Sequence, residues 1–426
     1  MSIPISTIPT TDILKDIKKS SPRPATVYYP KELDNCETKF TGYLYGYFQK
    51  ETNSFNVTRT ASEQENEQTK RITPLQEIGR VFSQKPSDNE KVLPENSGVE
   101  NYIYAYWEDD KIIFEAYSGY CEDENGQRNF IPCSIVSCKS EPYSLTLDVF
   151  SRNTGILETD VMLEKGVLVI GCGSVGSLIA LELARAGVGR FLLIDDDILG
   201  YHNICRHQCG IADVGKYKTD AVKERILQIN PKANVELRHR TIQEVPLPIL
   251  NNFCNENTIA TGCADNREGD LYINNIATEI GMPFMAVGCW ERACVGEIFY
   301  WLPKTTKHPQ GMPNYKDFIE TIGGISNRVN QNRRFYTNEE ELAKTVFEPG
   351  ISADINFVTT IAVKLAIDIL NQNNPQYEPR LLPHLTQYTL ICNTNNEKIG
   401  GDQVKIFSYP LQVTTSINIS YAAKNN

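Results

Sequence analysis

The residues with the clearest chemical potential form a glycine-rich turn. The run Gly171-Cys-Gly-Ser-Val-Gly176 directly follows an apolar stretch and opens a helical segment, a pattern typical of a phosphate site at a helix N-terminus. The candidate phosphate contacts are Gly171, Gly173, Ser174 and Gly176. Asp195 ends the next expected strand, where a carboxylate can bind ribose hydroxyls. These features indicate a nucleotide site and leave an NAD-type dehydrogenase and other nucleotide enzymes open.

A charged cluster after Asp195 separates these two interpretations. It consists of Asp196, Asp197, Asn203, Arg206 and Lys218. Hydride transfer does not require positive charge here, whereas an adenylating enzyme must neutralise a triphosphate, hold magnesium and release pyrophosphate. Asp265 ends a further strand and is expected in the same crevice, where its oxygens suit Mg²⁺ beside the α-phosphate. We therefore expect ATP and Mg²⁺ as the cofactors.

Strands and helices must alternate to position these residues, and the chain has this alternation beyond residue 164. Apolar runs predict strands at 167–170, 191–194, 259–262, 284–288, 386–392, 404–408 and 413–419. Helices are expected at 174–186, 216–230, 267–280 and 352–370. The pattern predicts an α/β class, with a doubly wound, Rossmann-like and mainly parallel sheet. Residues 304–347 are polar and poorly periodic, which favours a long functional crossover loop.

Residues 1–148, the first part of the chain, are expected to form a smaller β-rich α+β domain. We expect this domain to serve as an accessory, partner-binding module. Strands are expected at 25–29, 42–48, 54–60, 102–106 and 111–117, with one helix over 73–81. The first histidine of the chain is His202, which excludes a histidine-based metal site or catalytic triad in this domain. Residues 149–426 form the second expected domain.

Composition limits the partners and the compartment. Acidic residues number 53 against 42 basic ones, and a net charge of −11 argues against nucleic acid as the main partner. The longest apolar stretch, 167–193, contains charged residues, so no membrane span is expected. The N-terminus lacks the features of a signal peptide, and the 12 cysteines include no C-x-x-C pair. We expect free thiols, a cytoplasmic location and no zinc site.

Taken in order, the motifs resemble the ubiquitin-activating enzyme superfamily, of the ThiF/MoeB/HesA adenylyltransferase type. The resemblance covers residues 150–370 and is carried by Val167–Gly176, Leu193–Asp197, Asn203-x-x-Arg206, Gly215–Lys218 and Asp265-Asn266. It implies that Asp195 and Asp197 belong to the ATP site and that Asp195 binds ribose. It also implies that Asn203, Arg206 and Lys218 contact phosphates, and that Asp265 is the essential metal-and-phosphate aspartate. Arg152 resembles an arginine supplied to the partner subunit's ATP, so a homodimer is expected.

The resemblance implies ATP-dependent adenylation of the C-terminal carboxylate of a ubiquitin-like or carrier protein that ends in glycine. It further implies a bacterial ubiquitin-like conjugation pathway linked to antiviral defence, with a conjugating enzyme as a second partner. No cysteine lies between Cys294 and Cys392, which leaves thioester formation open, with Cys289 and Cys294 as the candidates. Two alternatives remain: a peptide-adenylating enzyme of the microcin-maturation type, and a catalytically inactive scaffold that binds carrier proteins.

Overall fold

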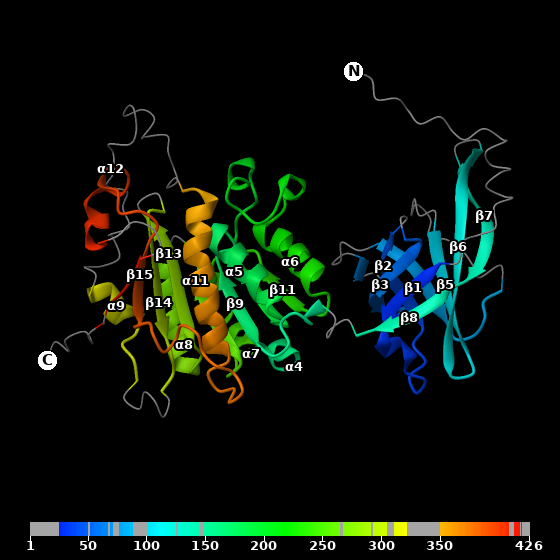
Figure 1. Ribbon diagram of the computed structural model, residues 1–426, viewed down its shortest axis with the longest axis horizontal. Helices are drawn as coiled ribbons and strands as arrows, with labels where there is room; N and C mark the ends of the chain where they lie inside the picture. Colours follow the sequence, from blue (N-terminus) through cyan, green and yellow to red (C-terminus); the bar gives the residue numbers. More distant parts are fainter. Residues whose placement is uncertain are drawn as a thin grey trace, which may run out of the picture. The chain divides into compact units, whose positions relative to one another are not determined.

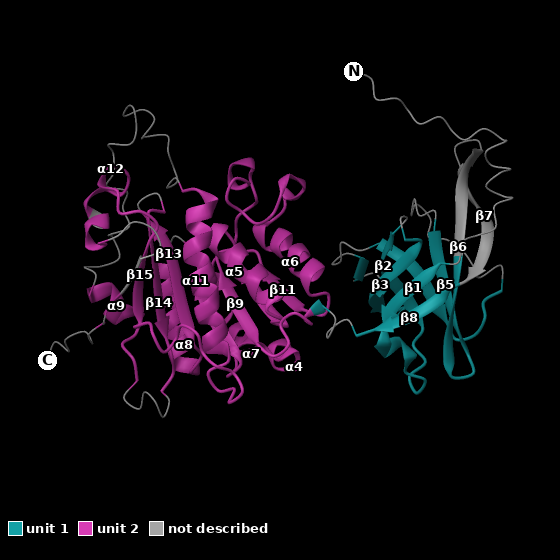
Figure 2. Cartoon of the chain, in the orientation of Figure 1, with its two compact units in different colours: residues 1–149 teal, residues 150–426 magenta. Residues whose placement is uncertain are grey.

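The structure is a computed structural model, and the chain folds into two compact units, residues 1–149 and 150–426 (Figure 2). It describes residues 25–49, 52–66, 69–70, 76–87, 101–124, 127–144, 149–264, 267–290, 293–304, 311–321, 350–408, 413–417 and 419. Each unit has one eight-stranded sheet and its own hydrophobic core.

The sheet of the first unit is mixed and has the order β7-β6-β5-β4-β2-β3-β1-β8. Its strands are β1 (Thr26–Pro30), β2 (Gly42–Gln49), β3 (Ser54–Ala61), β4 (Gln76–Phe82), β5 (Asn101–Glu108), β6 (Lys111–Glu124), β7 (Gln127–Ser137) and β8 (Lys139–Tyr143). A short 3₁₀ helix, η1 (Lys31–Asp34), follows β1. The core of this unit includes Leu44, Phe55, Ile103 and Phe114. The five predicted strands are present.

The helix predicted over 73–81 is wrong, because residues 76–82 form β4 and pair with β2 and β5. Ile78 and Val81 are buried β-branched residues, which favour a strand. Gly79 allows the neighbouring strand to approach closely, since a Cβ there would lie 2.7 Å from the carbonyl oxygen of Ile103. Residues 73–75 lie outside the described part of the chain.

The sheet of the second unit has the order β11-β10-β9-β12-β13-β14-β15-β16. Its strands are β9 (Gly166–Ile170), β10 (Arg190–Ile194), β11 (Asn234–Arg238), β12 (Thr258–Gly262), β13 (Phe284–Trp290), β14 (Val295–Trp301), β15 (Tyr388–Cys392) and β16 (Val413–Ile417). The strands from β11 to β13 pair in parallel, and β14, β15 and β16 extend the sheet in antiparallel fashion. The predicted α/β class with a doubly wound, mainly parallel sheet is confirmed.

Helices cover both faces of this sheet (Figure 1). One face carries α5 (Ser174–Arg185), α6 (Lys218–Ile229) and α11 (Ser352–Leu370), which bury Ile179, Ile226 and Val358. The other carries α7 (Leu247–Phe253), α8 (Arg267–Ile280) and α9 (Tyr315–Thr321), which bury Leu250, Ile273 and Phe318. The shorter elements are α4 (Thr159–Leu163), α12 (Glu397–Gly400), η2 (Tyr201–Asn203), η3 (Ile211–Asp213), η4 (Ile242–Glu244) and η7 (Gly401–Ile406).

Two expectations for the second unit need correction. The strand predicted at 404–408 is wrong, because Val404 belongs to η7, which begins at Gly401 with a φ of +73°. The segment 304–347 is not entirely loop, because α9 lies within it, while residues 305–310 and 322–347 lie outside the described residues. In the part of the chain that the structure describes, each helix falls short of the length or the hydropathy needed to cross a bilayer.

Candidate nucleotide site

The glycine turn lies between β9 and α5, and each of its glycines has a different environment. Gly171 adopts a φ of +85°, and a Cβ there would lie 2.8 Å from the amide nitrogen of Ala264. A Cβ on Gly176 would lie 1.8 Å from the carbonyl oxygen of Gly171, so the first turn of α5 packs directly against the turn. Gly173 precedes Ser174, the first residue of α5, and among the described residues a Cβ on it would have no neighbour within 4 Å. The turn is therefore closed around Gly171 and Gly176 and open at Gly173, where a phosphate can approach the N-terminus of α5.

Asp195 connects the end of β10 to this turn. Its Oδ2 accepts a hydrogen bond from the amide of Cys172 at 2.6 Å, and its Oδ1 accepts one from the amide of Asp197 at 2.8 Å. Burial raises the pKa of Asp195, and the positive charge of Lys218 opposes that shift. A carboxylate oxygen has more than one lone pair, so these bonds fix the orientation of Asp195 and leave acceptor capacity for ribose hydroxyls.

Lys218 is the first residue of α6, and its ammonium is held next to the same carboxylates. Its Nζ lies 2.6 Å from Oδ2 of Asp197, and its amide donates to the carbonyl oxygen of Asp197 at 3.0 Å. The lysine side chain is 12% exposed, whereas that of Asp197 is 67% exposed. The carboxylate oxygens of Asp195, Asp196 and Asp197 come within 4.8 Å of one another. A half-buried cation beside the glycine turn can neutralise a phosphate group.

Asn203 is the last residue of η2, and Arg206 lies on the segment between η2 and η3. The Asn203 side chain accepts from the amide of Gly200 at 2.9 Å, and its carbonyl oxygen accepts from the amides of Arg206 and His207 at 3.0 and 2.9 Å. Asn203 therefore shapes the local turn with both its side chain and its backbone. The Arg206 side chain is half-buried. The role of Arg206 as a phosphate contact stays a prediction.

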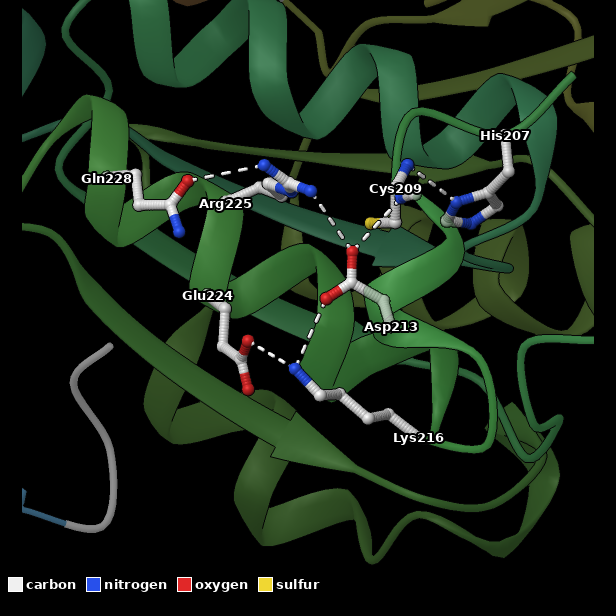
Figure 3. A network of polar contacts seen from close by, with 8 residues as sticks. His207, Cys209, Asp213, Lys216, Glu224, Arg225 and Gln228 are labelled. Atoms are coloured by element: carbon white, nitrogen blue, oxygen red, sulfur yellow. Dashed lines mark hydrogen bonds and ion pairs between the residues drawn. The ribbon is translucent and has the colours of Figure 1, made fainter. Parts of the chain in front are cut away.

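A polar network centred on Asp213 holds the following segment against α6 (Figure 3). Asp213 is 4% exposed and accepts from Gly210 N at 3.0 Å, Lys216 Nζ at 3.2 Å and Arg225 Nη2 at 3.2 Å. Lys216 also bonds to Glu224 at 2.5 Å. Burial alone would raise the pKa of Asp213, but these donors outweigh it and hold the pKa below its usual value. The network anchors the chain that leads from Asn203 and Arg206 to Lys218.

Sequence reasoning did not assign a role to Asp213 or to His207. His207 is 8% exposed, with Nε2 2.7 Å from the carbonyl oxygen of Cys172, and its Nδ1 accepts from the amide of Cys209 at 3.1 Å. The sequence signal for His207 was its place directly after Arg206, where the superfamily that the chain resembles commonly has glutamine. Asp213 stands close to Lys216, a spacing that gave no reason to expect a buried carboxylate.

The structure brings most of the predicted ATP-site residues to the carboxyl ends of β9 and β10. These residues are Gly171, Gly173, Ser174, Gly176, Asp195, Asp197 and Lys218, with Asn203 and Arg206 on the adjoining segment. Asp265 lies outside the described residues, so its place in the site stays a prediction. Arg152 is exposed in a turn ahead of α4. Its predicted role concerns a partner subunit.

The two thioester candidates differ in exposure. Cys294 is 3% exposed. It packs closely against Gly400, because a Cβ added to that glycine would lie only 3.3 Å from the Cβ of Cys294. Cys289 on β13 is half-buried and packs against the core beneath α5 and α11. An acyl group must reach the sulfur, so burial disfavours Cys294 and leaves Cys289 as the more accessible of the pair.

A family model and several curated relatives match part of the chain. The family model described as the ThiF family matches residues 147–398. A ubiquitin-like modifier-activating enzyme 5 of Arabidopsis thaliana is 32% identical over 181 residues, and that of Caenorhabditis elegans is 29% identical over 175 residues. Each match covers 39% of this chain and 42% of the relative, so the chain spans less than half the length of these relatives.

Solved structures give a weaker likeness. The structure of Escherichia coli MccB with ATP has a TM-score of 0.43 and 17% identity, and covers 62% of this chain and 67% of that chain. The structure of PaaA has a TM-score of 0.41 and 19% identity, with 55% and 71% covered. The family model, by contrast, spans the glycine turn, Asp195, Lys218 and Asp265 and covers more than half of the sequence. The chain belongs to the ThiF family, as the resemblance to the ubiquitin-activating enzyme superfamily implied.

Proposed function

We propose that the second unit binds ATP and transfers its adenylyl group to the C-terminal carboxylate of a ubiquitin-like or carrier protein. The proposal rests on one observation: hydrogen bonds and an ion pair connect the glycine turn, the carboxylates after β10 and the ammonium of Lys218. The glycine turn binds Asp195 through Cys172, and the neighbouring Asp197 holds the ammonium of Lys218. A phosphate cradle, a ribose carboxylate and a half-buried cation are the groups that an adenylating site requires.

In the proposed reaction a carboxylate oxygen of the carrier attacks the α-phosphorus of ATP. The bond from that phosphorus to the oxygen bridging to the β-phosphate breaks, and pyrophosphate leaves with the electron pair. Lys218 and Arg206 would stabilise the charge that develops on the phosphates, and Asp195 would orient the ribose. Bound Mg²⁺ would supply further charge neutralisation, with Asp265 as the proposed protein ligand.

The proposed substrate class rests on two supports. The sequence relatives are named for activating ubiquitin-like modifiers. The net charge of −11 favours a carrier with a basic face. The resemblance to the superfamily implies in addition that the carrier ends in glycine, a residue whose lack of a side chain lowers the steric cost of approaching a phosphate. A conjugating enzyme would be the next partner if a thioester forms, and Cys289 is then the proposed acceptor.

A second candidate function is adenylation of a short peptide without any enzyme thioester. Cys294 is buried, and no cysteine occurs between it and Cys392. A peptide-adenylating enzyme of the microcin-maturation type does not need an acceptor thiol. A reducible adduct between the enzyme and a carrier, lost in Cys289→Ala, would decide against this candidate.

We also propose a homodimer in which Arg152 of one protomer approaches the ATP of its partner. Arg152 is exposed in the isolated chain, as a residue that serves another subunit must be. Mixing Arg152→Ala protomers with Lys218→Ala protomers tests this arrangement, because a heterodimer would restore one intact site. Activity of the mixture equal to the sum of the separate variants would contradict it.

The test of the main proposal is ATP–pyrophosphate exchange with a carrier protein that ends in glycine. Carrier-dependent exchange in the wild type is expected, with loss in Lys218→Ala and Asp265→Ala. Lys364→Ala is the matched control, because Lys364 is an exposed lysine on α11 and outside the proposed site. Exchange with a short peptide alone would favour the second candidate. ATP binding without exchange on either substrate would overturn the proposal and favour an inactive scaffold.

A further inference from the structure

His207 fastens the segment that carries Asn203 and Arg206 to the glycine turn. The ring is buried, and its Nε2 lies 2.7 Å from the carbonyl oxygen of Cys172, between Gly171 and Gly173. Its Nδ1 accepts from the amide of Cys209 at 3.1 Å, two residues further along the chain. The amide of His207 itself donates to the carbonyl oxygen of Asn203 at 2.9 Å. One side chain therefore links both parts of the proposed phosphate site.

Only the neutral ring can make this link. Because Nδ1 accepts a hydrogen bond, it carries no proton, and the single proton of the ring must lie on Nε2, where it is donated to Cys172. Protonation would place a second N–H on Nδ1, directed at the amide of Cys209. Two donors would then face each other in a buried position, a costly arrangement that the chain can relieve only by separating.

Burial of the ring, more than the charges around it, favours the neutral form. Burial lowers the pKa of His207, and the positive charge of Lys218 lowers it further. The hydrogen bond to Cys172 and the carboxylate of Asp213 act in the opposite direction. The thiols of Cys172 and Cys209 stay neutral, because burial raises the pKa of each. The charged groups that act on His207 are thus Lys218 from α6 and Asp213 from η3.

We infer that His207 is a pH-sensitive positioning residue: its neutral ring holds Asn203 and Arg206 in register with the glycine turn, and its protonation releases them and weakens nucleotide binding. The inference rests on the proposed ATP site and adds a form of regulation to it. Acidification would act on the phosphate site through the protonation of His207, without a change in the protonation of Asn203 or Arg206.

The test is the affinity for Mg²⁺-ATP between about pH 8 and about pH 5, measured by isothermal titration calorimetry. The wild-type affinity should fall about tenfold per pH unit once the pH is below the pKa of His207. His207→Ala should bind weakly at every pH. His207→Gln should rescue binding and abolish the excess acid loss, because the amide supplies one donor and one acceptor and does not titrate.

His384→Gln is the matched control, because His384 is exposed on the loop between α11 and β15 and should keep the wild-type profile. Protonation of ATP itself affects every variant equally, so the comparison between variants removes it. A His207→Gln profile that follows the wild type would overturn the inference.

A second measurement needs no nucleotide and separates failure of this inference from failure of the proposed function. The ¹⁵N chemical shifts of the His207 ring should show a proton on Nε2 alone at neutral pH. Acid titration of the ring should coincide with faster hydrogen exchange at the Cys209 amide. A ring protonated on Nδ1 at neutral pH, or a Cys209 amide whose exchange ignores the titration, would contradict the inference. Absence of ATP binding in the wild type would instead reject the proposed function.

Discussion

The ammonium of Lys218 lies 2.6 Å from Oδ2 of Asp197 and joins the start of α6 to the residues that follow β10. The lysine is mostly covered and the aspartate is mostly exposed. An incoming triphosphate can therefore replace Asp197 as the partner of the lysine, because the displaced carboxylate is already exposed to solvent.

Lys218→Ala should lose at least about tenfold in ATP affinity, because a charge-assisted hydrogen bond to phosphate is worth about 1.5–3 kcal/mol. Thermal stability should change little, since an ion pair with one exposed partner contributes about 0–1 kcal/mol. Calorimetric titration with Mg²⁺-ATP and a melting curve measure the two effects. Wild-type affinity in the variant would remove Lys218 from the proposed site.

Gly173 and Gly176 form a matched pair of positions in one turn. Gly173→Ala should fold normally, because its Cβ would meet no atom of the described residues within 4 Å. It should bind ATP more weakly, because the added methyl group would enter the space proposed for the phosphate. Gly176→Ala should be destabilised by about 1–3 kcal/mol, because its Cβ would lie 1.8 Å from the Gly171 oxygen. Urea denaturation should show the loss of stability in Gly176→Ala, and ATP titration should show the loss of affinity in Gly173→Ala. Equal stability of the two variants would contradict this description of the turn.

Asp213→Asn should lower the free energy of unfolding of the second unit by about 1.5–3 kcal/mol at neutral pH, because a charged acceptor of three hydrogen bonds is lost. The folded-state pKa of Asp213 is below its unfolded value. Its stabilisation is therefore complete above the unfolded pKa and disappears as the pH falls through the folded pKa. Urea titrations of wild type and variant should converge in acid, below about pH 4. A difference that persists unchanged in acid would show that the carboxylate charge is not the source.

Arg267 and Glu297 form a buried ion pair at 2.8 Å, and both side chains are at most 6% exposed. Glu297 also accepts from the hydroxyl of Tyr388 at 3.0 Å. Arg267→Ala should lower the free energy of unfolding by about 3–5 kcal/mol, because it removes one member of a buried ion pair. The triple variant Arg267→Met, Glu297→Leu, Tyr388→Phe should recover most of that loss in chemical denaturation. A triple variant less stable than Arg267→Ala would contradict the argument.

The local elements of the second unit were largely predictable from the sequence. The apolar run before the glycine turn predicted β9, and the bounds of α11 agree with the structure at both ends. Both segments have a strong local signal: one is uniformly apolar, and the other is a long apolar-rich helix. β14 was not predicted, because Glu297 interrupts its apolar sequence and is accommodated through contacts with Arg267 on α8 and Tyr388 on β15. The formation of this strand therefore depends on contacts between segments that are distant in the sequence.

The polar connections of the site were less predictable than its chemistry. The types and order of Asp195, Asn203, Arg206 and Lys218 indicated nucleotide binding. The bonds of His207 to Cys172 and Cys209, and those of Asp213 to Arg225, depend on how a segment without regular periodicity folds over the turn. No local propensity encodes such pairings. The strand β4 was missed for a related reason, since its neighbours β2 and β5 stabilise a segment that also suits a helix.

The most direct test of adenylation measures which phosphate of radiolabelled ATP is transferred to the carrier. The wild-type protein, Mg²⁺ and a glycine-ended carrier are incubated separately with α-³²P-ATP and with γ-³²P-ATP, and the protein-bound product is isolated under mildly acidic conditions. Label on the carrier from α-³²P-ATP alone, absent with Asp265→Ala, is the predicted result. Label from γ-³²P-ATP would mean phosphoryl transfer, and no label from either nucleotide despite ATP binding would contradict adenylation of the carrier.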